Sequence, residues 1–170
     1  SGGWVIRMGD PSMKPLPPLP NVIDYAHGAL KTPKADIVIS LGCRFFLGTN
    51  SGFATIPAIY GVRCVFSNWL PIGLPLWPSQ DLVMPKWFRS KKENRNLTLE
   101  EVFSSGLAFV QNWADLPEGV ELCDNSPEDL LALTAEALEG GDPAPAAVIA
   151  ARGQYRRVAE ANCSYVGSTL

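Results

Sequence analysis

Two stretches of this chain combine residue types that bind anions. Arginine offers a planar pair of donors to a phosphate, glycine lets the backbone approach a ligand, and hydroxyl or amide side chains add further donors. One stretch covers residues 7–10 and the other covers residues 48–52. The candidate binding residues are Arg7, Gly9, Asp10, Gly48, Thr49, Asn50, Ser51 and Gly52.

The surrounding sequence predicts the elements that position these residues. Apolar runs predict strands at 4–8, 21–26, 44–48 and 62–66 and helices at 35–43 and 53–60, the second helix ending at Gly61. Strand–helix–strand units of this length predict an α/β fold with a parallel, Rossmann-like sheet flanked by helices. Ligands of such sheets bind at the carboxyl ends of strands, where helix N-termini also attract anions. We therefore expect a diphosphate cradle.

Each half of this cradle has an ordinary structural interpretation as well. Arg7 alone is compatible with an ion pair to Asp24 or Asp36, and residues 48–52 alone with a turn followed by a helix cap. Both interpretations stay open at this point.

The remainder of the chain divides into a predicted loop and a predicted helical part. Residues 67–96 hold Trp69, Trp77, Trp87 and four prolines and predict a long irregular excursion. Residues 97–170 are expected to be mainly helical, with the first start marked by a Thr98/Glu101 capping box and a Leu97/Val102 staple. A second helix is expected from Ser126-Pro127 to Gly140-Gly141, with Leu131, Thr134/Ala135 and Leu138 on one face. A last helix is expected at 146–161, with Arg152, Arg156 and Arg157 on its polar side.

Composition excludes several classes of protein. The chain has 170 residues, expected to form a single domain, and a net charge of −3, which argues against a nucleic-acid binder. Residues 1–95 nevertheless carry +6 and residues 96–151 carry −11, so an anionic ligand is expected in the first part. We find no run of about 20 apolar residues and no signal peptide, so a cytoplasmic protein without a membrane span is expected.

Cysteine and histidine are too sparse for common metal or triad chemistry. The four cysteines form no CxxC pair, and His27 is the only histidine. We therefore expect no metal, no other cofactor and no Ser-His-Asp triad.

The order of several motifs resembles a known family. These are I-R-M-G-D-P-S-M-K-P-L-P, D-Y-A, C-R-F-F-L-G-T-N-S-G, G-V-x-C and N-W-x-P-x-G. Over residues 4–100 they resemble a bacterial family of glycosyltransferase-like proteins and, more distantly, fucosyltransferases and heptosyltransferases of the GT-B fold. Residues 101–170 show no such resemblance.

The resemblance implies the donor-binding, carboxyl-terminal half of a GT-B enzyme, with a nucleoside-diphosphate sugar as ligand and no metal. Arg7 would neutralise the diphosphate, and residues 49–51 would contact phosphate or sugar. Asp10 is the weak candidate for a catalytic residue, and Asn68 and Trp69 are candidate contacts to base or sugar. A complete GT-B enzyme has two such domains and about twice this length, so transfer activity itself stays open.

Two alternatives from other functional classes remain. One is a non-catalytic, oligomeric interaction protein on the same half-scaffold, self-associating as a homodimer through an apolar surface or the 67–90 loop. The other comes from residues 14–20, whose sequence Lys-Pro-Leu-Pro-Pro-Leu-Pro fits the basic-x-x-P-x-x-P pattern of polyproline ligands.

Overall fold

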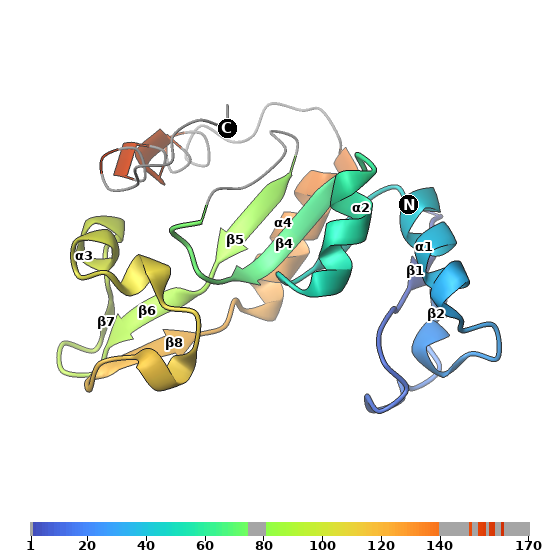
Figure 1. The fold of residues 1–170 in the computed structure, drawn as a ribbon, viewed down its shortest axis with the longest axis horizontal. Helices are drawn as coiled ribbons and strands as arrows, with labels where there is room; N and C mark the ends of the chain where they lie inside the picture. Colours follow the sequence, from blue (N-terminus) through green and yellow to red (C-terminus); the bar gives the residue numbers. More distant parts are fainter. Residues whose placement is uncertain are drawn as a thin grey trace. The chain divides into compact units, whose positions relative to one another are not determined.

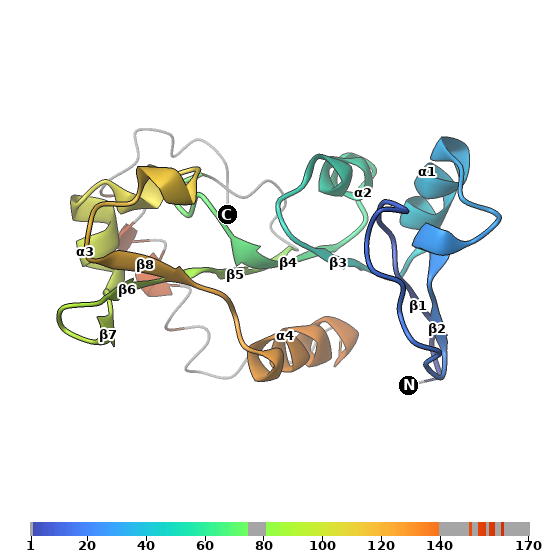
Figure 2. The ribbon, with the colours of Figure 1, turned by 90° about the horizontal axis from the view of Figure 1, so that it is seen from below.

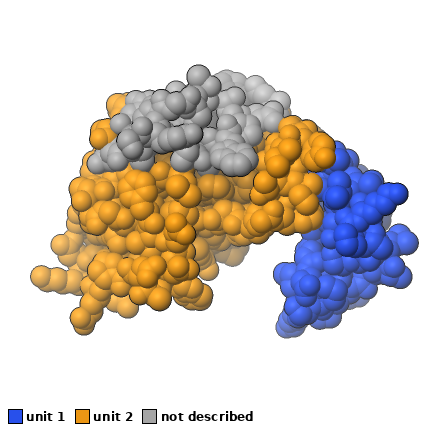
Figure 3. Space-filling view, viewed as in Figure 1, with its two compact units in different colours: residues 1–43 blue, residues 44–170 orange. Residues whose placement is uncertain are grey.

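The computed structural model describes residues 2–74, 81–139, 150, 153–155, 157–158 and 161. The chain divides into two compact units, residues 1–43 and residues 44–170, coloured separately in Figure 3. Each unit is described by itself.

Unit 1 contains a small parallel strand pair and one helix. Strand β1 (Val5–Ile6) pairs with β2 (Val22–Ile23), and a 3-10 turn, η1 (Tyr25–His27), follows. Helix α1 (Pro33–Gly42) begins at Thr32, whose hydroxyl accepts the amide of Ala35 at 3.1 Å. Proline suits the first helical position because its missing N–H has no partner there anyway. The helix predicted at 35–43 is therefore confirmed, beginning two residues earlier than expected.

Unit 2 is built around a parallel sheet of order β3-β4-β5 (Figure 1). Its strands are β3 (Phe46–Gly48), β4 (Cys64–Trp69) and β5 (Leu82–Pro85). A 3-10 turn, η2 (Gly52–Ala54), and helix α2 (Thr55–Ile59) connect β3 to β4, and Gly61 ends this connection at φ +75°. The strands predicted at 44–48 and 62–66 are confirmed, and the helix predicted at 53–60 consists of these two short pieces.

Helices cover both faces of this sheet, as Figure 2 shows for α2 and α4 (Pro127–Glu139). Successive side chains of a strand point to opposite faces. Val65 of β4 accordingly packs with Leu133 and Ala137 of α4, whereas Cys64 and Phe66 pack with residues of η2 and α2. The chain is thus a mixed α/β protein with a parallel sheet and flanking helices.

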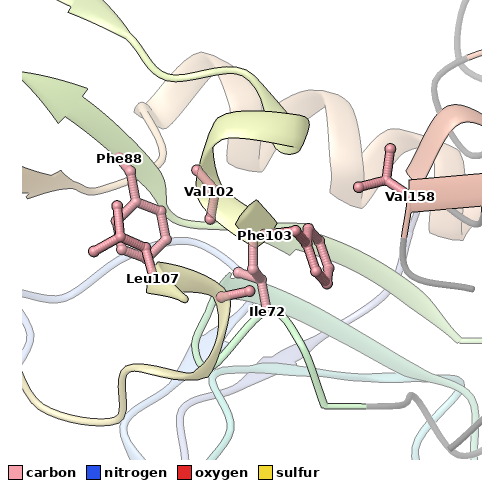
Figure 4. Packing of buried hydrophobic residues seen from close by; sticks show 7 residues of the cluster. Ile72, Phe88, Val102, Phe103, Leu107 and Val158 are labelled. Carbon is pink, nitrogen blue, oxygen red and sulfur yellow. The ribbon is translucent and has the colours of Figure 1, made fainter. Parts of the chain in front are cut away.

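A second, antiparallel sheet follows within unit 2. Its order is β7-β6-β8, formed by β6 (Trp87–Ser90), β7 (Arg95–Asn96) and β8 (Val120–Cys123). Helix α3 (Leu99–Ser104) and the 3-10 turns η3 (Leu107–Phe109) and η4 (Trp113–Asp115) lie between β7 and β8 in the sequence. Figure 4 shows the buried cluster of this region, formed by Ile72, Phe88, Val102, Phe103, Leu107, Ala108 and Val158.

These strands correct one prediction and add to another. Residues 67–96 are not one irregular segment, because their described part contains the end of β4 and all of β5, β6 and β7. The described part from residue 97 on contains helices α3 and α4 and, in addition, strand β8, which pairs with β6 along four residues. Each of these strands is short, and its partner lies far away in the sequence, so local periodicity gives little signal for it.

The helix starts predicted at Thr98 and at Ser126-Pro127 are confirmed, and the predicted face of α4 is wrong. The start predicted at residue 146 lies outside the described residues. Thr98 and Glu101 form a complete capping box, and Leu97 packs on the cluster that contains Val102. In α4 the buried residues are Leu133 and Ala137, whereas Leu131 is 71% exposed. Both faces carry apolar residues, and the face that meets β4 and β5 becomes the buried one. Residues 77, 140, 141, 152 and 156, which enter the predictions above, lie outside the described residues.

The Glu101 carboxylate fastens α3 to the preceding strand. It accepts the Thr98 amide at 2.7 Å and both Nη atoms of Arg95 at 2.8 and 2.6 Å. The hydrogen bond from the Arg95 guanidinium is the largest cause that lowers the pKa of Glu101, from its usual 4.5 to about 2. A carboxyl with a lowered folded-state pKa stabilises the fold above its unfolded pKa and loses this effect as the pH falls through its folded value.

We therefore expect the Glu101→Gln variant to show a flatter loss of thermal midpoint than the wild type between about pH 5 and pH 2. The difference between the two proteins should be small, since this ion pair is solvent-exposed. Thermal unfolding followed by circular dichroism across this range measures it. Glu118→Gln, which removes an exposed carboxylate outside the box, serves as the control. Parallel pH profiles for wild type and Glu101→Gln would contradict the assignment.

Candidate functional site

The carboxyl ends of β3 and β4 lie side by side at one edge of the parallel sheet, because the two strands pair in parallel up to Gly48 and Phe66. We call this place the carboxyl edge and define it as residues 48–52, 67–70, 85–86 and 124–126. The buried Ser67 hydroxyl donates to the Gly48 carbonyl at 3.5 Å, and the Asn50 side-chain amide donates to the Leu70 carbonyl. The structure thus brings together two groups of predicted site residues, residues 48–52 and the pair Asn68 and Trp69.

Residues 49–52 form an exposed turn at this edge. The Ser51 amide donates to the Thr49 carbonyl at 2.7 Å, and the Ala54 amide donates to the Ser51 carbonyl at 3.0 Å. Ser51 is extended and precedes η2, yet its hydroxyl makes no cap hydrogen bond there. Helix α2 contributes little macrodipole, because it has only five residues. Anion binding at this turn would therefore depend on its own amides and hydroxyls.

The end of β4 contains a bulge that changes the direction of its last residues. Residues 67 and 68 lie opposite one residue of β5, since Phe66 pairs with Val83 and Trp69 with Pro85. Asn68 adopts φ +53°, the left-handed region that asparagine tolerates better than most residues. Bulges of this kind bend a strand and redirect its side chains.

Asn125, which no sequence pattern indicated, holds this bulge in place. Its side-chain oxygen accepts the Asn68 amide at 2.6 Å, and its own amide donates to the Asn68 side-chain oxygen at 2.7 Å. The Asn125 side-chain nitrogen also donates to the Pro85 carbonyl at 2.8 Å. Asn125 is 6% exposed and directly precedes the Ser126 cap of α4, so it ties this helix to the ends of β4 and β5. The Asn68 side chain therefore has a structural role, because its oxygen accepts the Asn125 amide.

Trp69 lies at the same edge but packs inward. Its ring centroid is 5.0 Å from that of Phe66, and it belongs with Phe46 and Val83 in the cluster beneath α2. The indole Nε1 is buried and finds no hydrogen-bond acceptor among the described residues. An unpaired buried donor costs free energy.

Charge at the carboxyl edge is balanced within the protein. Lys86 follows β5 directly, and its ammonium pairs with the Asp124 carboxylate. The edge therefore offers hydrogen-bond donors to a ligand without a positioned general base among its described residues. This arrangement suits binding.

Arg7, the other predicted anchor for a diphosphate, lies in unit 1 and has partners there. Its Nη1 donates to Asp24 at 2.8 Å, and its Nη2 donates to the Lys14 carbonyl at 2.7 Å. The predicted ion pair with Asp24 is confirmed, whereas Asp36 pairs with Lys31 instead. The two predicted halves of the cradle thus belong to different compact units.

Asp24 has several hydrogen-bond partners in unit 1, and we call this set of contacts, together with those of Arg7 and His27, the clasp. Its second oxygen accepts the Leu16 amide at 2.9 Å and lies 3.0 Å from His27 Nδ1, while His27 Nε2 lies 3.0 Å from the Pro11 carbonyl. The pKa of Asp24 lies below its usual range, chiefly because of the hydrogen bond from the Leu16 amide and also because of His27 and Arg7. The clasp fastens the proline-rich segment to the end of β2.

Asp10 and Gly9 serve a turn. The Asp10 carboxylate accepts the Ser12 amide at 2.8 Å, and this hydrogen bond is the main cause that lowers its pKa. A lowered pKa makes a carboxylate a weaker base, so the geometry gives Asp10 no advantage as a general base. Gly9 adopts φ +145°, where a Cβ would collide with the Met13 side chain. Glycine is required here by the local backbone.

Comparisons of the chain with protein-family models, curated proteins and solved structures give no match. The family resemblance therefore remains a hypothesis, and the functional argument depends on the geometry.

Within the described ranges, no group of three or more His, Cys, Asp or Glu side chains is placed to hold a metal ion, and none of the helices has the length and apolar character needed to cross a membrane. An open hollow of about 370 Å³ in unit 2 is lined by Gly106, Phe109, Val110, Gln111, Asn112 and Asp115. Its only charged lining residue is an acid, so it does not suit a diphosphate.

The role of Asn125 is directly testable. Asn125→Ala should destabilise the protein by about 1–3 kcal/mol, because it leaves the Asn68 amide and the Pro85 carbonyl without their partner in a buried place. Chemical denaturation measures this loss. Asn112→Ala, which removes an exposed asparagine of the same unit, should change stability by less than about 0.5 kcal/mol. An equal decrease in the free energy of unfolding of both variants would show that the hydrogen bonds of Asn125 do not stabilise the carboxyl edge.

Proposed function

We propose that the carboxyl edge binds a nucleoside-diphosphate sugar and that the parallel sheet of unit 2 is part of a Rossmann-like donor-binding domain. One observation carries the proposal. The exposed turn 49–52 and the bulged end of β4 meet where parallel α/β sheets bind their ligands.

The turn supplies the groups that a diphosphate needs. Its four residues are exposed, and the hydroxyls of Thr49 and Ser51 are donors that a phosphate accepts. A Cβ built on Gly52 meets no atom within 4 Å, so this glycine is not required by packing. Close approach of a ligand gives it a functional reason.

Asn68 and Trp69 enter the proposal as residues that shape the edge. Because the Asn68 side chain is held by Asn125, its contribution to a ligand would come from the bulged backbone. The Trp69 indole would gain a hydrogen-bond partner only if a ligand or a local movement reached its Nε1.

Arg7 is a separate part of the proposal. Its guanidinium already neutralises Asp24, and its fork geometry leaves further donors for a second anionic partner. Because Arg7 belongs to unit 1, any contact it makes with a phosphate is proposed for unit 1 by itself. The proposal concerns binding, since the described residues of the carboxyl edge offer no positioned base.

The first test is a thermal-shift screen of the whole chain against GDP, UDP, ADP, CMP and their sugars, with and without Mg²⁺. A ligand that binds the native state raises the unfolding midpoint by mass action, so one base family should produce a shift. In Gly52→Ala the added methyl group should weaken that ligand by about tenfold or more while the unliganded midpoint stays near the wild-type value.

Gly42→Ala provides a matched control. Its Cβ also meets no atom within 4 Å, and it lies at the end of α1 in unit 1, so it is not part of the turn 49–52. The proposal fails if no nucleotide shifts the midpoint, or if Gly52→Ala and Gly42→Ala respond alike to the ligand.

One observation favours the second candidate, a self-associating protein. The described part of unit 1 exposes several apolar side chains on α1, including Val38 at 62%. Exposed apolar surface of this kind marks interaction sites. The expected loop at 67–90 is not available for this role as a loop, because its described residues belong largely to β4, β5 and β6.

The Arg7→Ala variant separates the two candidates. If Arg7 itself contacts a diphosphate, the ligand-induced shift of Arg7→Ala should be smaller than that of the wild type, because a bidentate cationic partner is lost. For a purely structural Arg7, only the unliganded midpoint should fall, since Asp24 loses its partner. Thermal shift and light scattering on the same samples measure both effects. A mass that equals one chain at high concentration would contradict self-association.

A further inference from the structure

The segment from Lys14 to Pro20 has its backbone shape set by proline. Every one of its seven residues is either a proline or directly precedes one. The proline ring holds φ near −65°, and the residue before a proline is restricted to extended conformations. The segment therefore favours the polyproline II helix, which has three residues per turn and no internal hydrogen bonds.

The structure presents this segment on the surface of unit 1. All residues from 11 to 20 are exposed except Leu16, which is half-buried, and none belongs to a helix or strand. The clasp holds the segment at a few backbone groups only, through Arg7 to the Lys14 carbonyl and through Asp24 to the Leu16 amide. A segment that is ordered before it binds loses less entropy on binding.

In a polyproline II helix, side chains three residues apart share an edge, so the segment has three edges in this conformation. Pro17 and Pro20 share one edge, Leu16 and Leu19 share the next, and Pro15 and Pro18 form the third. Leu19 is 49% exposed, and both prolines of the first edge are exposed. Two neighbouring edges of alternating leucine and proline form an apolar ridge that an aromatic-lined groove accommodates.

We propose that Lys14–Pro20 is a docking motif for a partner domain with an aromatic-lined polyproline groove and an acidic pocket at one end. Lys14 is exposed, and it forms no ion pair among the described residues, so its charge is available to a carboxylate of the partner. Its place before the first leucine–proline pair sets the direction in which the motif lies in the groove. This interaction is independent of nucleotide binding at the carboxyl edge.

The test uses the whole chain and an isolated, ¹⁵N-labelled SH3 domain that accepts proline ligands with a leading basic residue. We expect chemical-shift changes confined to the aromatic groove and the acidic pocket of the SH3 domain as the chain is added. The double variant Pro17→Ala/Pro20→Ala should weaken binding by about tenfold or more, because both prolines leave the groove. Lys14→Glu should also weaken it, whereas Lys14→Arg should retain it, and higher salt should act in the same direction as the loss of Lys14.

Pro18→Ala is the matched control, because it removes a proline from the edge that points away from the groove. It should change affinity by no more than about twofold, and all variants should keep the wild-type thermal midpoint, since exposed residues carry little packing. The proposal is overturned if no groove shifts appear with the chain at about 1 mM. It is also overturned if the double proline variant binds like the wild type, or if Pro18→Ala loses as much affinity as the double variant.

Discussion

Strand β4 is the constraint on which unit 2 depends. It hydrogen-bonds to β3 on one side and to β5 on the other, and four of its six residues are buried. Because strand side chains alternate, Val65 fixes the face that α4 covers, and Cys64 and Phe66 fix the face that α2 covers. A shift of one residue in its register would exchange the two faces, so the positions of both helices follow from this one strand.

The end of the same strand determines where a ligand could bind. The regular pairing of β4 ends at a bulge. Asn125 forms hydrogen bonds with the backbone of Asn68 and Pro85, which would otherwise be unpaired there. The exposed turn after β3 ends at the same edge and is joined to β4 through Asn50 and Ser67. The sheet thereby supports an exposed turn that carries the hydroxyls of Thr49 and Ser51.

Unit 1 also provides hydrogen-bond partners for backbone groups that lie outside regular strands and helices. Its proline-rich segment has few amides of its own and cannot form strand pairs along its length. One carboxylate, Asp24, gathers an arginine, a histidine and a backbone amide, and the remaining contacts are to carbonyls of the segment. Order is therefore obtained without secondary structure, and the outer edges of the segment stay exposed.

The ends of several helices could be predicted from the sequence alone. The Thr98/Glu101 capping box, the Ser126-Pro127 helix start and the Gly61 stop each depend on residues within one turn of each other, and all are present. The strands at 44–48 and 62–66 were also predictable, because each contains three consecutive apolar residues, 45–47 and 64–66. The ion pair of Arg7 with Asp24 appeared only as one of two structural alternatives, since neither partner identifies the other locally.

Tertiary structure alone decided the features that join distant segments. The short strands β5, β6, β7 and β8 exist because each finds a partner along a neighbouring chain segment, and their own residues give weak periodicity. The buried face of α4 was selected by β4 and β5, as Leu131 and Leu133 are equally apolar in sequence and differ only in what they meet. Asn125 acquired its role from a bulge 57 residues earlier. Sequence determines what each segment is able to form, and packing between segments determines which of these possibilities satisfies the most backbone and buries the most apolar surface.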